Sequence, residues 1–211
     1  MSLNHTLHCS SCVSACVMFI ALLLALKTDG APQATRQSLE FIHQLQAREM
    51  HRLAEVYCRQ QLSPDGGPDQ APFVLELMNS LAGQALAQRD LNDTSHWEAI
   101  EAIGDQIQQR WEPSLAANEV NLRRYWLRLA RGRWLRVATN HDAQSDRHNE
   151  QAKELLRRTS DELKKLAEET TLLLRTPDAA NSLDTSRSLQ RLLQQIEFAR
   201  GEVMLSHAEY Y

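Results

Sequence analysis

Residues 97–111 have the sequence WEAIEAIGDQIQQRW, and this stretch decides the fold class. Its large apolar side chains recur at intervals of three and four residues, which places them on one face of an α-helix. The intervening positions are mostly Glu, Gln, Asp and Ala. The stretch therefore predicts an amphipathic helix whose apolar face is buried against neighbouring helices. The residues of that face are Trp97, Ile100, Ile103, Ile107 and Trp111.

The rest of the chain has the same helical character. Among its 211 residues, Leu (32), Ala (24) and Gln (17) dominate, whereas Val and Ile together supply only 13. Unbranched side chains lose little rotamer freedom in a helix, and β-branched ones favour strands. Apolar stripes separated by Pro, Gly and Asn predict six or seven helices with short connections and no strand. We expect an all-α fold of stacked antiparallel helix pairs, either an α-solenoid or an irregular helical bundle.

The breaks between the stripes place the helix ends. The apolar stripe of residues 39–45 is out of phase with that of residues 50–57, so two short helices are expected to meet near Arg48 and Glu49. Residues 63–70 (SPDGGPDQ) predict a loop, and Pro72 suits the first position of the helix that follows. Pro113 and Pro177 are expected to stop two further helices.

Residues 145–175 have a heptad-like pattern of apolar residues and Thr, with charged side chains between them. The positions of the pattern are Ala152, Leu155, Thr159, Leu163, Leu166, Thr170 and Leu173. This pattern fits a long helix within the domain. It also supports an alternative function, in which the protein is a membrane-anchored, coiled-coil-like structural protein and this segment pairs with another chain.

Six arginines fall between residues 123 and 136, with aromatic residues among them. On a helix, Arg124, Arg128 and Arg131 share one stripe, and we take them, with Trp134, as candidate partner-binding residues. Arginine and aromatic side chains together also suit a polyanion or single-stranded nucleic acid. However, the eight acidic residues between 142 and 169 could neutralise the arginines within the chain, and the net charge is −4. We therefore favour salt bridges, to a neighbouring helix or to a partner, over nucleic acid.

The N-terminal segment predicts membrane targeting. Residues 13–26 (VSACVMFIALLLAL) are an apolar run of 14, which is short for a spanning helix and suits the core of an export signal. We expect residues 1–31 to be a cleaved signal peptide or a short N-terminal membrane anchor. Residues 32–211 then form a helical repeat-like domain, which could be the front part of a longer array. The protein is expected to be exported or anchored in the membrane.

The chain offers no pattern that predicts catalysis. The four cysteines include three within the targeting segment, and Cys58 lies among apolar residues. The histidines are scattered, without the spacings of a zinc site, and no nucleophile or phosphate-binding motif is present. Only seven glycines rule out a glycine-rich nucleotide fold. We expect no enzyme activity, no cofactor and no metal.

Two segments resemble the tetratricopeptide-repeat superfamily, in the degenerate form found in bacterial envelope proteins. Residues 41–57 (FIHQLQAREMHRLAEVY) are similar to a first helical hairpin, although Glu49 stands where that hairpin normally has Gly. Residues 81–86 (LAGQAL), followed by 97–100 (WEAI), resemble the next helix pair. The resemblance implies a right-handed stack of helix pairs and a non-catalytic scaffold that binds an unidentified protein partner.

Overall fold

The computed structural model describes residues 33–88, 90–138 and 145–210, and these residues are helical with no strand among them. The chain divides into two units after Arg36, and the arrangement below is that of the second unit. The expectations for residues 1–31 lie outside the described residues. None of the described helices is long and apolar enough to cross a bilayer. The helices are α2 (Gln33–Ala47), α3 (His51–Gln61), the 3₁₀ turn η1 (Pro68–Gln70), α4 (Ala71–Ala87), α5 (Ser95–Arg110), α6 (Leu115–Ala138), α7 (Ser145–Leu174), α8 (Pro177–Asn181) and α9 (Leu183–Ala208).

The predicted breaks coincide with the observed helix ends. Pro72 lies in the first turn of α4, and the Ser114 hydroxyl accepts a hydrogen bond from the Ala117 N–H at the start of α6. Pro177 does end α7, but it also begins the short helix α8, with Thr176 as its N-cap. Helix α8 is the element that the apolar pattern did not predict, because five residues are too few to show a period.

The turn between α2 and α3 is the expected one. Glu49 has φ 60°, which is the left-handed conformation that Gly adopts without steric cost. The backbone N–H of Met50 donates to the carbonyl of Leu45 across this turn. The turn therefore has the left-handed backbone conformation that Gly adopts most easily, although residue 49 is Glu.

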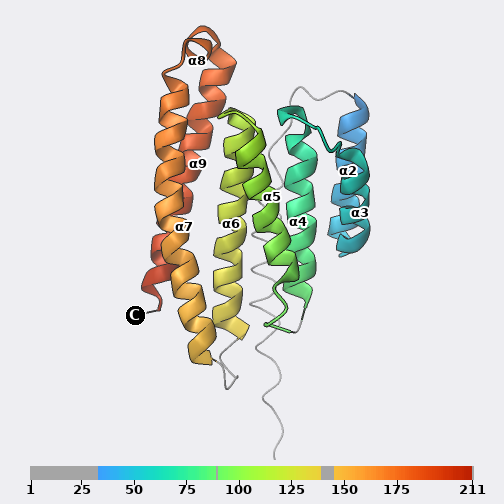
Figure 1. The fold of residues 1–211 in the computed structure, drawn as a ribbon, viewed down its shortest axis with the longest axis vertical. Coiled ribbons are helices and arrows are strands. Elements are labelled where there is room, and N and C mark those ends of the chain that lie inside the picture. The colour runs from blue at the N-terminus through green and yellow to red at the C-terminus, as the bar shows by residue number, and fades with distance from the viewer. Residues whose placement is uncertain (1–32, 89, 139–144, 211) are drawn as a thin grey trace, which may run out of the picture. The chain divides into compact units, whose positions relative to one another are not determined.

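Most helix contacts join helices that are one or two places apart along the chain, and α6 also packs against α9. Helix α4 contacts α3, α5 and α6, and helix α6 contacts α4, α5, α7 and α9. Helix α7 lies against α6 and α9 (Figure 1). The predicted all-α fold of stacked antiparallel helices is confirmed.

The core contains the stripe that decided the fold class. Trp97, Ile100, Ile107 and Trp111 are buried, while Ile103 is only half-buried. Around them lie apolar residues of α2, α3, α4 and α6, so the amphipathic prediction holds for four of the five positions.

The heptad-like seam of α7 is also buried. Leu163 and Leu166 of the predicted pattern are at most 1% exposed, and the helix packs against α6 and α9. The pattern is wrong at Leu155, which is half-buried, because Leu156 takes the buried position there. Gly132 of α6 lies within α6 rather than at a turn, and Leu156 approaches it so closely that a Cβ there would be 3.2 Å away. These buried positions of α7 are thus covered within the chain, by α6 and α9.

Candidate interaction site between α5, α6 and α7

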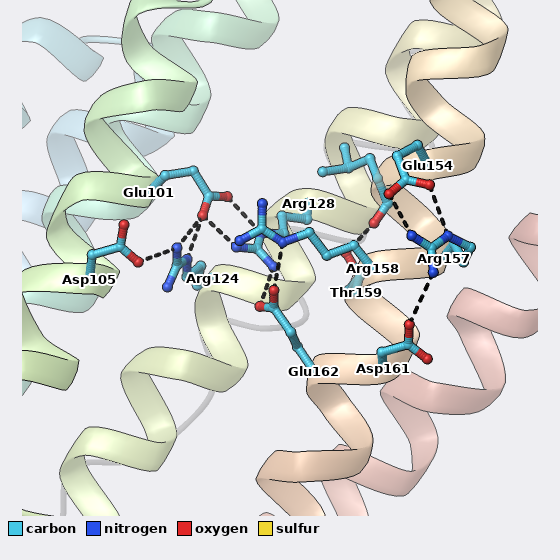
Figure 2. Close-up of polar contacts among 11 residues, drawn as sticks. Glu101, Asp105, Arg124, Arg128, Glu154, Arg157, Arg158, Thr159, Asp161 and Glu162 are labelled. Atoms are coloured by element: carbon cyan, nitrogen blue, oxygen red, sulfur yellow. Dashed lines mark hydrogen bonds and ion pairs between the residues drawn. The ribbon is translucent and has the colours of Figure 1, made fainter.

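Two of the candidate arginines are buried and form a network of ion pairs with acids that are half-buried or exposed. Arg124 contacts Glu101 and Asp105 of α5 at 2.5 and 2.6 Å, measured from its Nη2 atom. Arg128 contacts Glu101 through Nε at 2.6 Å and Glu162 of α7 through Nη1 at 2.5 Å. Figure 2 shows Glu101 between the two arginines, with Arg128 reaching from it to Glu162. The network therefore joins three helices.

The environment keeps this network ionised. Burial opposes the charge of Arg128, but the contacts with Glu101 and Glu162 outweigh it and raise the pKa of the guanidinium. Burial alone would raise the pKa of Glu101, yet Arg128 and Arg124 lower it overall. Arg158 likewise pairs with Glu162 at 2.7 Å, and both Arg158 and Arg128 help to lower the pKa of Glu162. Arg128, Glu101 and Glu162 therefore carry their charges at neutral pH.

The sequence predicted that the arginines form an exposed stripe on the helix. This prediction is wrong for Arg124 and Arg128. The side chains of Arg124 and Arg128 are only 4% and 3% exposed, so a partner cannot reach them as a surface stripe. The acids that pair with these two arginines come from α5 as well as from α7. The arginines are therefore neutralised within the chain, as the sequence predicted. Arg131 is half-buried, with its guanidinium 5.7 Å from the centre of the Trp97 ring. Trp134 is half-buried.

A polar cleft of about 200 Å³ lies beside the network, between α5, α6 and α7. Its cationic side chains come from α6 and α7, and its acids come from α5 and α7, so the lining has no net charge. The lining residues are Asp105, Gln108, Asn121, Arg124, Tyr125, Arg158, Glu162, Lys165, Leu166 and Glu169.

Asn121 is the unusual residue of this cleft. Its side chain is 6% exposed, and its buried Oδ1 has no hydrogen-bond partner among the described residues. Leaving a buried amide oxygen without a partner costs about 1–3 kcal/mol. One turn earlier on α6, Asn118 donates from Nδ2 to the Thr170 hydroxyl at 3.0 Å. The same residue type is thus satisfied at 118 and unsatisfied at 121, where it lines the cleft.

Tyr125 lies one turn after Asn121 and lines the same cleft. Its ring is 5.3 Å from the Arg128 guanidinium, and burial raises the pKa of its hydroxyl. The hydroxyl therefore stays protonated and can donate a hydrogen bond. Sequence reasoning missed Asn121 and Tyr125 because an isolated polar residue on a mostly buried helix has no periodic signal.

A second buried polar cluster connects α2, α4 and α6. His43 Nε2 lies 3.1 Å from Glu76 Oε1, in an ion-pair contact. Asn79 donates to Glu76 at 3.1 Å and accepts from Arg123 at 3.3 Å. The Glu76 contact raises the pKa of His43, and the pKa of Glu76 is lowered by His43 and Asn79 despite its burial. Sequence reasoning missed this cluster, although Glu76, an acid between the apolar residues Leu75 and Leu77, could have indicated it.

Among the described residues the cysteine is Cys58, which is buried. Burial raises the pKa of the Cys58 thiol to about 12, so it is protonated and weakly nucleophilic at neutral pH. Among residues 33–88, 90–138 and 145–210, no cluster of His, Cys, Asp or Glu has the arrangement of a metal site.

No family model matches this chain, and comparisons with curated proteins and with solved structures find no match. The function is therefore inferred from the fold and the cleft alone.

Proposed function

We propose that the protein is a non-catalytic helical scaffold that binds a protein partner at the cleft between α5, α6 and α7. As part of this proposal, it is a degenerate member of the tetratricopeptide-repeat superfamily and acts in the exported or envelope fraction, or while anchored in the membrane. The packing supports the repeat interpretation, because most helix contacts join helices one or two places apart along the chain, although α6 also packs against α9.

The observation that carries the proposal is the unsatisfied amide of Asn121. Among the buried polar atoms of the described residues that lack a hydrogen-bond partner, Asn121 Oδ1 is the one that lines this cleft, and a bound group that completes its hydrogen bonds would explain its retention there. The Asn121 amide presents both an acceptor and two donors.

The size and charge of the cleft define the bound group. At about 200 Å³ the cleft is smaller than the roughly 300–1,000 Å³ of ordinary small-molecule pockets, and so fits one residue of a partner rather than a cofactor. Its cations, Arg124, Arg158 and Lys165, are balanced by three acids of the lining, which disfavours a polyanion. We infer that the partner inserts an uncharged polar group, such as a Gln or Asn side chain or a backbone amide.

Site-specific photo-crosslinking tests this proposal. Gln108 is exposed on α5 and lines the cleft, so a photoreactive residue there should form an adduct with one partner protein in cells. The matched control is the same residue at Gln60, which is exposed on α3 and away from the cleft lining. Asn121→Leu should abolish the Gln108 adduct without unfolding the chain. An adduct that is equally strong at Gln60, or is unchanged by Asn121→Leu, would contradict the proposal.

A further inference from the structure

Helix α9 is apolar on two opposite faces. Its inner face is buried against α6 and α7 and includes Leu192, Ile196 and Val203, each at most 2% exposed. Its outer face has Phe198 at 58% exposure and Leu205 at 64%. Large exposed apolar side chains gathered on one face often mark a contact with another molecule. The Phe198 ring contacts the Trp126 ring of α6, with 5.9 Å between the ring centroids, and the rest of this outer face is exposed in the described part of the chain.

Gly201 lies in the middle of this outer face. In the described helices, Gly83, Gly104 and Gly132 each have a side chain of another helix where their own Cβ would be, from His51, Arg124 and Leu156 respectively. A Cβ at Gly201 would meet nothing within 4 Å. Gly in a helix interior costs about 1 kcal/mol relative to Ala. In this protein helical glycines mark places where another helix packs closely, and at Gly201 that helix is missing.

The basic residues of the same stripe lie at one end of it and the acidic residue lies at the other end. At the helical period of 100° per residue, the basic positions 187 and 191 and the acidic position 209 align with Phe198, Gly201 and Leu205. Arg187 and Arg191 are exposed before the apolar centre. Glu209 is exposed after it, in contact with Arg136 of α6. The stripe is thus basic at its beginning, apolar in its middle and acidic at its end.

We propose that the outer face of α9 binds the same face of a second copy of this chain, with the two α9 helices antiparallel. Around a twofold axis midway between residues 198 and 201, Phe198 of each copy packs onto Gly201 of the other. Such an interface is self-complementary, as twofold symmetry requires. The antiparallel direction brings Arg191 of one copy opposite Glu209 of the other, whereas a parallel pair would place like charges together. The interface uses α9 alone and is independent of the proposed cleft function.

The size of the face indicates a concentration-dependent dimer. Helix α9 has 26 residues, which corresponds to a strip about 39 Å long and about 10 Å wide, or about 400 Å² per copy. Stable interfaces bury about 800 Å² per partner, so this one is expected in the range of weak, reversible association.

Sedimentation velocity of the full chain across a wide concentration range tests the proposal. Wild type should show a reversible monomer–dimer equilibrium. Gly201→Gln should remain monomeric at every concentration with an unchanged or raised Tm, because a side chain there meets nothing in its own copy. Leu53→Glu, at an exposed apolar position of α3, is the matched control and should dimerise like wild type. A wild-type chain that is always monomeric, or a Gly201→Gln variant that still dimerises, would overturn the proposal.

Cysteine crosslinking tests the direction of the helices, in a chain whose Cys9, Cys12 and Cys16 are replaced by Ser. Gly201→Cys lies near the twofold axis and should form a disulfide-linked dimer on mild oxidation. Arg187→Cys lies far from the axis in an antiparallel pair and should remain monomeric. Efficient crosslinking through both positions would indicate parallel helices and would refute the proposed arrangement.

Discussion

The two asparagines on α6 allow a sharp test of the site, because they share a helix, a residue type and a degree of burial. Asn118 is 2% exposed and donates to Thr170, which is itself fully buried. Asn121 is 6% exposed, and its Oδ1 has no partner. Replacing either by Leu keeps the branching of the side chain and adds the same increase in volume and a similar apolar contribution at both positions. The difference between the two variants therefore isolates the hydrogen bond at Asn118 and the unsatisfied oxygen at Asn121.

The magnitudes follow from these contacts. Asn118→Leu removes one buried hydrogen bond, although the Thr170 hydroxyl still donates to the Leu166 carbonyl at 2.8 Å, so we expect a loss of about 1 kcal/mol. Asn121→Leu removes a desolvated group that has no partner, and should stabilise the chain by about 1 kcal/mol. For a chain of this size each such change shifts Tm by about 2–4 °C.

Urea unfolding of the full chain measures both variants, with Thr170→Val added to complete a double-mutant cycle. The cycle should give a coupling of about 1 kcal/mol between Asn118 and Thr170, and none between Asn121 and Thr170. A loss of stability in Asn121→Leu equal to that in Asn118→Leu would refute the reasoning. It would mean that ordered water already satisfies Asn121 and that the residue is structural.

Three further predictions concern stability. Arg128→Met leaves two acids without their buried partner and should lower the free energy of unfolding in urea by about 3 kcal/mol, whereas Arg157→Ala, at an exposed ion pair on α7, should cause no measurable change. Gly83→Ala should lower Tm because its Cβ would lie 2.5 Å from a histidine ring of α3, whereas Gly201→Ala should raise the stability of the monomer by about 1 kcal/mol. In the folded chain the pKa of His43 is raised above its ordinary value of 6.5. The ion pair of His43 with Glu76 therefore stabilises the fold fully below pH 6.5, as long as the Glu76 carboxylate stays ionised. This stabilisation is lost as the pH rises through the raised pKa of His43. The destabilisation by His43→Gln, measured by urea unfolding across this range, should therefore disappear at alkaline pH, and a constant effect would contradict it.

The sequence predicted the helices well because their signals are local. Prolines and N-caps act within one turn, and apolar periodicity shows which face of each helix is buried. The stripe beginning at Trp97 and the heptad-like pattern of residues 145–175 both became core as a result. The turn at Glu49 was also predictable, from the change of phase between the stripes on either side.

The site was less predictable because its partners are distant in sequence. A row of arginines on a helical wheel suggests an exposed face, yet Arg128 is buried by Glu101, 27 residues before it, and by Glu162, 34 residues after it. The periodicity of one helix does not show which charged face of another helix packs against it. An unsatisfied amide such as Asn121 can be recognised only when every neighbour has been placed.

The sequential packing of the helices has a consequence for how the molecule opens. Because α9 is held by α6, α7 and α8, it can separate without breaking the contacts between α3 and α4 or between α4 and α5. Partial unfolding should then proceed from the side of α9, and amide hydrogens should exchange in groups rather than together. Helix α6, which contacts four other helices, should exchange last. A protein built in this way can lose one helix to thermal motion, or release it to a partner, while the polar cleft keeps the walls contributed by α5 and α6.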